Sequence, residues 1–241
     1  MKRVPTIASL TLIVTIAAVG QQPRSPSEER FGEGLRAVQL ISNVLAKAHV
    51  SASLEFNGKC GPGFLVPDLP RVRESREPYS QNPVETLRSM FSVDHGMTVS
   101  QESNGTIRVV EAGVQTDILD VRISHLSFDR ISDPQQALSV VLGAPEVRSF
   151  IQAHGIGQPF NTYAAPLYAL PGFNKSPVSG VRSISGELNN VTLADALDYI
   201  LKTFPGFWLY QNCQGPDGQR VVHFGVPGGI WMWENGQTLV K

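Results

Sequence analysis

The sequence lacks the patterns by which most metal sites and catalytic nucleophiles are recognised. Its five histidines are scattered, and no two of them lie three or four residues apart, which argues against a zinc motif. There is no Gly-x-Ser-x-Gly elbow, no Ser-x-x-Lys pair and no phosphate loop ending in Gly-Lys-Ser or Gly-Lys-Thr. We therefore expect no metal, no cofactor and no catalytic residues, and we predict a protein that is not an enzyme.

Cysteine is also scarce, since Cys60 and Cys213 are the only two in the chain. In an oxidising compartment two cysteines can form a disulfide. Each of them lies beside a glycine-rich turn, in a different half of the sequence. Spacing alone does not bring two side chains together, so a disulfide and two free thiols both remain open.

The chain has little excess of charge of either sign. If Lys2 and Arg3 are removed with an N-terminal signal, 18 basic side chains remain against 21 acidic ones. This balance is too near neutral to predict a nucleic-acid partner. Hydrophobic residues make up 41% of the chain, which favours a folded protein with a core over a disordered one.

The longest hydrophobic run, from Ile7 to Val19, is too short to span a bilayer comfortably. It follows two basic residues and ends in the small residues Ala18-Val19-Gly20, as a secretory signal does. We therefore predict a signal peptide at 1–20, removal of that segment, and a periplasmic or secreted location with no membrane span afterwards. A retained anchor is the alternative. The polar residues 21–33 are expected to form a flexible leader.

The segment 181–241 has the signals of a helix followed by a β-hairpin. Thr192 can cap a helix while Asp195 reaches back to it, as in a capping box. Pro205-Gly206 ends the helix, because proline cannot continue it and glycine tolerates the turn that follows. Residues 207–210 and 220–226 are strand-like, and a turn at 215–218 joins them. One apolar stripe recurs at helical spacing in this segment: Leu193, Leu197, Ile200, Leu201 and Phe204.

An upstream segment repeats this pattern without a gap at an offset of 110 positions. The offset places Leu197 on Leu87, Gly206 on Gly96 and Gln211 on Gln101. The upstream copy has its own helix cap at Asn82-Pro83 and a hairpin turn at Asn104-Gly105. We interpret the chain as a diverged internal duplication.

The remaining segments complete the prediction of an α+β fold. A helical stripe begins near Leu35, and a strand at 51–56 follows it. We expect a first unit at 34–112 with a long loop at 57–81, and a second unit at 181–241 with an aromatic C-terminal strand. The segment 113–180 should hold a strand at 118–124, a helical insert and a Pro-rich linker. The two related helix-plus-β-hairpin units should each carry a small mixed or antiparallel sheet.

The segment from Glu187 to Tyr210, within the second unit, resembles the short N-terminal domain of secretins and TonB-dependent receptors, known as the STN domain. The resemblance is carried by Val191-Thr192-Leu193-Ala194-Asp195-Ala196-Leu197 and the apolar positions after it. It implies a strand, a helix and a strand pair, in a bacterial module that acts in docking or signalling and has no catalytic residues. The upstream copy departs from the family pattern, with Pro83 and Thr86 where that family has an apolar residue and alanine.

Aromatic residues gather near the C-terminus and offer the best candidate binding surface: Trp208, Tyr210, Trp231 and Trp233. Trp231 and Trp233 alternate, so both can project from one face of a strand. We predict an exported, non-enzymatic interaction or docking module of the cell envelope with a protein partner. The alternatives are a glycan or small-ligand binder that uses these aromatics, and an envelope hydrolase whose site is assembled from scattered residues.

Overall fold

The computed structural model of the chain describes residues 26–59, 72–73, 82–92, 96–157, 182–215, 218–226, 233–234 and 237–238. The predicted signal peptide, most of the predicted loop at 57–81, Cys60 and Trp231 lie outside these residues. None of the described helices is long and apolar enough to cross a membrane.

The chain combines helices with β-sheet, which confirms the predicted α+β class. The helices, with η1 a single 3₁₀ turn, are α1 (Pro26–Ala48), α2 (Pro83–Met90), η1 (Asp117–Asp120), α3 (Pro134–Leu142), α4 (Pro145–Ala153) and α5 (Leu193–Thr203). The strands are β1 (Ala52–Lys59), β2 (Met97–Gln101), β3 (Ile107–Glu111), β4 (Arg122–Ile131), β5 (Ile184–Thr192), β6 (Phe207–Gln214), β7 (Arg220–Gly225), β8 (Trp233–Glu234) and β9 (Gln237–Thr238).

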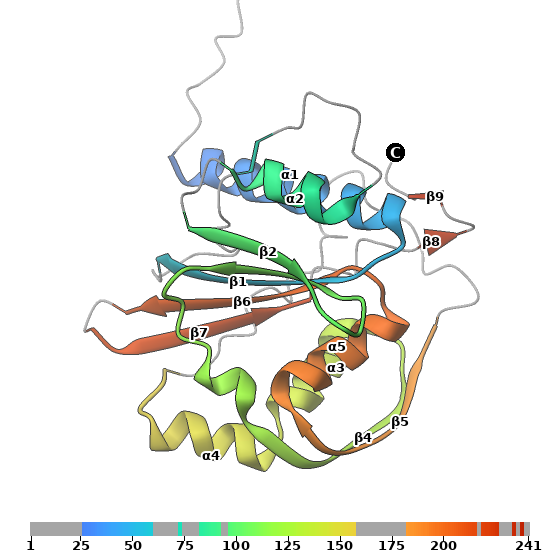
Figure 1. Cartoon of the computed structure of the whole chain (residues 1–241). Coiled ribbons are helices and arrows are strands. Elements are labelled where there is room, and N and C mark those ends of the chain that lie inside the picture. The colour runs from blue at the N-terminus through green and yellow to red at the C-terminus, as the bar shows by residue number, and fades with distance from the viewer. Residues whose placement is uncertain are drawn as a thin grey trace, which may run out of the picture.

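A five-stranded sheet in the order β2-β3-β1-β6-β7 runs through the centre of the molecule (Figure 1). The hairpins β2-β3 and β6-β7 are antiparallel, whereas β1 pairs in parallel with β3 on one side and β6 on the other. The two hairpins were expected to form separate small sheets. Instead β1 lies between them and pairs with β3 and β6, so the backbone groups on both of its edges are hydrogen-bonded and the two hairpins share one sheet.

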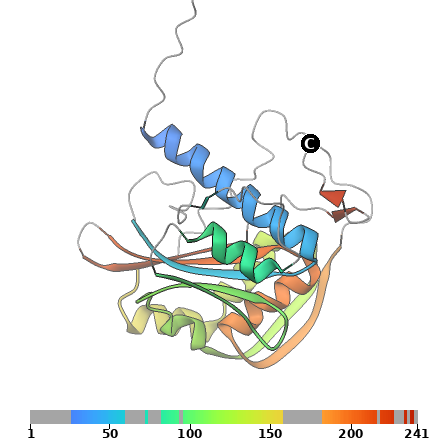
Figure 2. The same cartoon turned by 45° about the horizontal axis from the view of Figure 1, so that its top comes forward.

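Side chains alternate between the two faces of this sheet and build two hydrophobic cores. Phe207 and Leu209 of β6 face α1 and α2, whereas Trp208 and Tyr210 face the layer that contains α3 and α5. Figures 1 and 2 show α1 and α2 above the sheet and the other helices below it. Burying a large apolar side chain stabilises a fold by about 1.5 to 3 kcal/mol, so these two layers supply much of the driving force.

A separate two-stranded antiparallel sheet, β4-β5, closes the lower layer (Figure 1). Helix α3 packs on β4 and α5 packs on β5, so both helices lie between the small sheet and the large one. The register of β4 and β5 shifts between Phe128 and Ile131, where Arg130 adopts a left-handed backbone with φ of 48°. Such a bulge bends the ribbon and increases its twist.

The helix caps predicted from the sequence are present. Thr192 and Asp195 form a reciprocal capping box at the start of α5. The Asn82 side chain accepts hydrogen bonds from the amides of Val84 and Glu85 at the start of α2. These contacts satisfy amide groups that have no partner inside the helix.

Two element boundaries differ from the prediction. Residues 26–33, expected to belong to a flexible leader, are the first turns of α1, with Pro26 at a position that suits proline. The strand expected from Ile118 begins only at Arg122, because Ile118 and Leu119 form η1 and are buried there. Alternation over a few residues did not distinguish a strand from a tight helical turn.

Candidate functional site in the pocket between η1 and α4

An open pocket with a volume of about 460 Å³ lies between η1 and α4. It is lined by Asp117, Asp120, Val121, Glu146, Ser149, Phe150, Ala153 and His154. The set combines three carboxylates, one imidazole and one hydroxyl with three apolar side chains. These residues come from two segments that are about 30 positions apart in the sequence.

Helix α4 forms one wall of this pocket with a single stripe of side chains. Glu146, Ser149, Phe150 and Ala153 follow one another at the spacing of neighbouring helical turns. Val147 and Ile151, on the adjacent face, are 0% and 9% exposed and anchor the helix in the lower core. Burial of that face therefore fixes the direction in which the stripe points.

Glu146 is held at the first turn of α4 by a neighbouring strand. Its Oε1 atom accepts hydrogen bonds from the amide of Ser124, at 3.0 Å, and from the hydroxyl of Ser124. These hydrogen bonds hold the pKa of Glu146 below its usual value, so the group is a carboxylate at neutral pH. Its Oε2 atom is shielded from solvent and has no hydrogen-bond partner within the described ranges.

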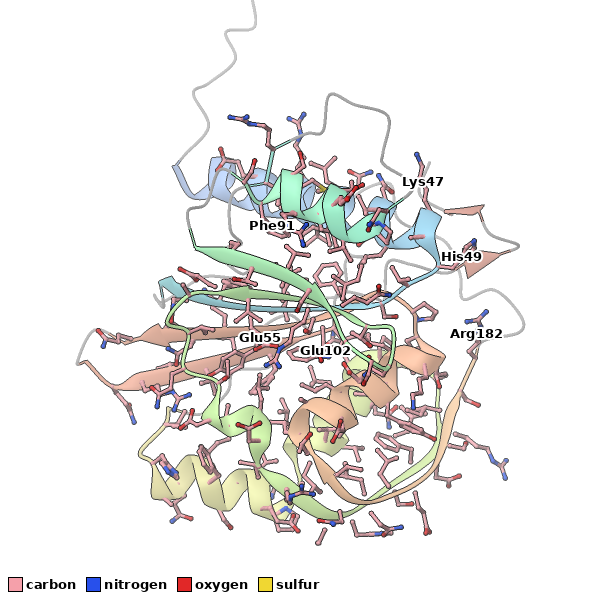
Figure 3. All side chains as sticks on the ribbon, in the orientation of Figure 1. Lys47, His49, Glu55, Phe91, Glu102 and Arg182 are labelled. Atoms are coloured by element: carbon pink, nitrogen blue, oxygen red, sulfur yellow. The ribbon has the colours of Figure 1, made fainter. Side chains whose placement is uncertain are left out.

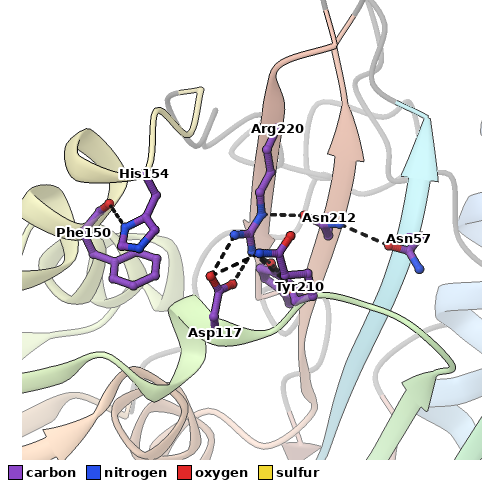
Figure 4. Close-up of polar contacts among 8 residues, drawn as sticks. Asn57, Asp117, Phe150, His154, Tyr210, Asn212 and Arg220 are labelled. Atoms are coloured by element: carbon purple, nitrogen blue, oxygen red, sulfur yellow. Dashed lines mark hydrogen bonds and ion pairs between the residues drawn. The ribbon is translucent and has the colours of Figure 1, made fainter.

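His154 ends α4 and stacks on Phe150, with ring centroids 3.9 Å apart and an angle of 21° between the planes (Figure 4). Its Nδ1 atom lies 2.9 Å from the Phe150 carbonyl oxygen. Because a carbonyl oxygen only accepts hydrogen bonds, Nδ1 carries the hydrogen and donates it. In the neutral ring, Nε2 is then an acceptor.

Asp117 on η1 is engaged by Arg220 of β7 (Figure 4). Arg220 Nη2 lies 2.6 Å from Asp117 Oδ1, and Nη1 lies 3.1 Å from Oδ2, which makes a bidentate ion pair. Partial burial would raise the pKa of Asp117, but the hydrogen bonds and the charge of Arg220 outweigh it and keep the pKa below its usual value. Asp117 is therefore ionised, and its negative charge is balanced by the positive charge of Arg220.

The same arginine links the pocket to the central sheet. Tyr210 donates a hydrogen bond to the Gln115 carbonyl at 2.6 Å and accepts one from Arg220 at 2.9 Å. Burial raises the pKa of Tyr210 to about 12, so its hydroxyl remains protonated. Arg220 Nε also donates to Asn212, whose side-chain amide donates to Asn57 at 3.2 Å. Figure 4 shows this chain of contacts running from η1 across β7, β6 and β1.

A second polar cluster lies on the same face of the sheet, away from the pocket. Glu55 of β1, labelled in Figure 3, is 0% exposed and accepts two hydrogen bonds from Arg108 of β3, at 2.7 and 2.8 Å. The Arg108 side chain keeps 38% of its surface exposed. This pair ties the central strand to the first hairpin.

Asp198 of α5 joins the two halves of the chain. It accepts a hydrogen bond from the Trp208 indole at 2.7 Å and one from Asn104, in the turn of the first hairpin, at 3.0 Å. Burial raises the pKa of Asp198 above its usual value despite these two donors. The hydrogen bonds of Asp198 hold the β2-β3 turn against α5, so the role of Asp198 is structural.

The aromatic residues predicted to bind a ligand do not form one surface. Trp208 and Tyr210 are 2% and 0% exposed and belong to the lower core, which corrects the expectation that they offer a stacking face. Their sheet face is covered by helices, whereas a binding face must stay open. Trp233 lies in β8, with its side chain outside the description, and Trp231 lies outside the described residues.

Cys213 of β6 is disulfide-bonded and lies opposite Gly58 of β1. The only other cysteine in the sequence is Cys60, which lies outside the described residues. The register places the end of β1, at Lys59, next to Gln214. We propose that the bond joins Cys213 to Cys60 and fastens β1 to β6.

Sequence reasoning missed the pocket residues. None of the four titratable lining residues, Asp117, Asp120, Glu146 and His154, belongs to a sequence motif. Within the described ranges, no three His, Cys, Asp or Glu side chains are grouped so that they could hold a metal ion. The chain matches no protein-family model, no curated protein and no solved structure.

Proposed function

We propose that the chain is an exported, non-enzymatic docking module of the bacterial cell envelope that binds a protein partner. The observation that carries the proposal is the order of β5, α5, β6 and β7. It follows the strand, helix and strand pair implied by the resemblance of this segment to STN domains, which act in docking and signalling. The predicted signal at 1–20 supports export.

The residues that carry the resemblance have a structural task in this fold. Leu193, Ala196 and Leu197 are all 0% exposed and pack α5 into the lower core. Thr192 closes the capping box that begins the helix. Because the motif builds the scaffold, the surface around it is free to differ between modules that bind different partners.

We also propose that the helix-plus-hairpin segments are related by duplication. Helices α2 and α5 begin 110 positions apart, at Pro83 and Leu193, and strands β2 and β6 begin at the same offset. Gly96 and Gly206 precede these strands, with φ of 134° and 152°, values that favour glycine. Helix α2 covers one face of the five-stranded sheet and α5 covers the other. A rotation of 180° about an axis that lies in the sheet, perpendicular to the strands, exchanges the two faces and so accounts for this placement.

The pocket between η1 and α4 supports a second candidate, an envelope hydrolase. His154 presents Nε2 as an acceptor at a pocket that also holds carboxylates, which is the minimum for general base catalysis. Against it, Asp117 is bound by Arg220 and Glu146 is bound by Ser124. Docking remains the better supported proposal.

Export and partner binding can be tested together in a Gram-negative host. The full chain with a C-terminal tag should be recovered from the periplasm without residues 1–20, as N-terminal sequencing would show. Cross-linking in intact cells should then join it to one envelope protein at fixed stoichiometry, whereas the same chain retained in the cytoplasm should not form that product. Recovery of the unprocessed chain, or of no discrete product, would contradict the proposal.

The enzymatic alternative needs its own measurement. Serine- and cysteine-directed probes should leave the folded protein unlabelled, and hydrolysis of ester, amide and glycoside substrates should equal the buffer rate. Activity that disappears in His154→Gln, in a variant with an unchanged melting temperature, would favour the hydrolase instead.

A further inference from the structure

We propose that the pocket between η1 and α4 receives a basic side chain, arginine or lysine, from the protein partner. This inference rests on the proposed docking function and adds to it the surface and the chemistry of recognition.

The apolar part of the pocket suits the stem of a long side chain. Val121, Phe150 and Ala153 line it, and Val121 and Phe150 are half-buried, so each keeps part of its surface open to a ligand. The aliphatic stems of arginine and lysine pack on such surfaces while the charged head stays at the rim. An aromatic ring near a cation adds further attraction.

The rim carries unneutralised negative charge. Asp117 is paired with Arg220, so its charge is already balanced. Asp120 is exposed and makes no hydrogen bond or ion pair with the described part of the chain. The negative charge of Asp120 helps to raise the pKa of Arg108, but the Arg108 guanidinium donates its hydrogen bonds to Glu55 and not to Asp120.

Glu146 adds a second negative charge, since Ser124 donates to only one of its oxygens. When its ring is neutral, His154 also offers Nε2 as a hydrogen-bond acceptor at the same rim. Two of the carboxylates that line the pocket therefore have no cationic partner in the described part of the chain, and none of the lining residues is lysine or arginine. An anionic ligand would be repelled there, and a cationic head on an apolar stem is the complementary occupant.

Nuclear magnetic resonance titration of the exported, signal-processed protein tests this directly. The probes are Nα-acetyl-arginine amide and Nα-acetyl-lysine amide, whose only charge is on the side chain. The control probe is Nα-acetyl-citrulline amide, which keeps the shape of arginine without the charge. Backbone amides of residues 117–121 and 146–154 should shift with both basic probes and not with citrulline, and the shifts should weaken as salt is raised.

Matched variants locate the site. Asp120→Asn and Glu146→Gln should each weaken binding of the arginine probe by at least about threefold, the size expected for a partly exposed charge pair. Asp129→Asn removes an exposed carboxylate on β4 that does not line the pocket and should leave binding unchanged. Equal binding of citrulline, shifts confined to other residues, or equal losses in all three variants would overturn the inference.

The cellular cross-link separates this inference from the proposed function. If the cross-linked product persists in Asp120→Asn/Glu146→Gln at the level of Asp129→Asn, docking stands and the pocket is not its site. If the probes bind the pocket but no cross-linked product forms in any form of the protein, the docking function itself is wrong. Loss of the cross-linked product only in Asp120→Asn/Glu146→Gln supports both the docking function and the pocket as its site.

Discussion

Replacing Arg108 with methionine should destabilise the protein strongly, although the residue lies near the surface. Methionine keeps an unbranched apolar stem but removes the cation that neutralises Glu55, which is 0% exposed on the central strand β1. Ser53 then remains as the side-chain donor to that carboxylate, at 3.4 Å. An uncompensated buried charge is among the costliest defects in a folded protein.

The expected magnitude follows from the exposure of the two partners. Removing one partner of a buried ion pair costs about 3 to 5 kcal/mol. Because 38% of the Arg108 side chain is exposed, water can replace part of the lost interaction. We therefore expect a loss of about 2 to 4 kcal/mol in the free energy of unfolding, and a fall in melting temperature of about 6 to 12 °C for a chain of this size.

Urea denaturation followed by circular dichroism would measure this loss. Arg148→Met, at an exposed position on α4, is the matched control and should change the free energy of unfolding by less than about 0.5 kcal/mol. The double variant Glu55→Met/Arg108→Met should recover most of the loss, since an apolar pair can replace a buried ion pair. A loss below about 1 kcal/mol, or a double variant no more stable than Arg108→Met, would refute the reasoning.

Three further predictions concern other contacts that hold the fold. Burial raises the pKa of Asp198, so the folded state favours its protonated form, and stability should fall as pH rises above the ordinary value of 3.8. Asp198→Asn should remove that part of the pH dependence in denaturation curves measured from pH 3 to 7, and an unchanged slope would contradict the assignment. Gly58→Ala should lower the free energy of unfolding by about 1 to 3 kcal/mol through overpacking, because the new Cβ would lie 1.6 Å from the Gln211 amide nitrogen. Gln211→Ala in the same background should restore part of this loss. Reduction of the Cys213 disulfide should lower the melting temperature, with an upper bound of about 4 to 5 kcal/mol for a long closed loop; two reactive thiols in the unreduced, denatured protein would disprove the bond.

Local sequence signals determined most of the secondary structure. The caps at Thr192 and Asn82, the glycine after α5 and the Asn104-Gly105 turn act within a few residues of themselves, so their effects can be predicted without the rest of the fold. The same holds for the apolar stripe of α5, whose spacing identified the buried face. The α+β class follows from these elements together.

The tertiary structure decided how the elements assemble. Whether β1 would pair between the two hairpins depends on contacts between Ala52 and Phe207, far apart in the sequence, and no local pattern specifies such a pairing. The burial of Trp208 and Tyr210 was decided in the same way, because an aromatic residue in a strand suits a core and a binding surface equally.

The pocket between η1 and α4 depends on the fold in the same sense. Asp120 and Glu146 belong to separate elements and form part of no motif, and each is placed by the burial of its apolar neighbours against the lower core. Side chains that meet only through packing leave no spacing rule in the sequence. The amino-acid sequence by itself therefore determined the elements and their caps, whereas packing over long sequence separations decided the sheet order and the site.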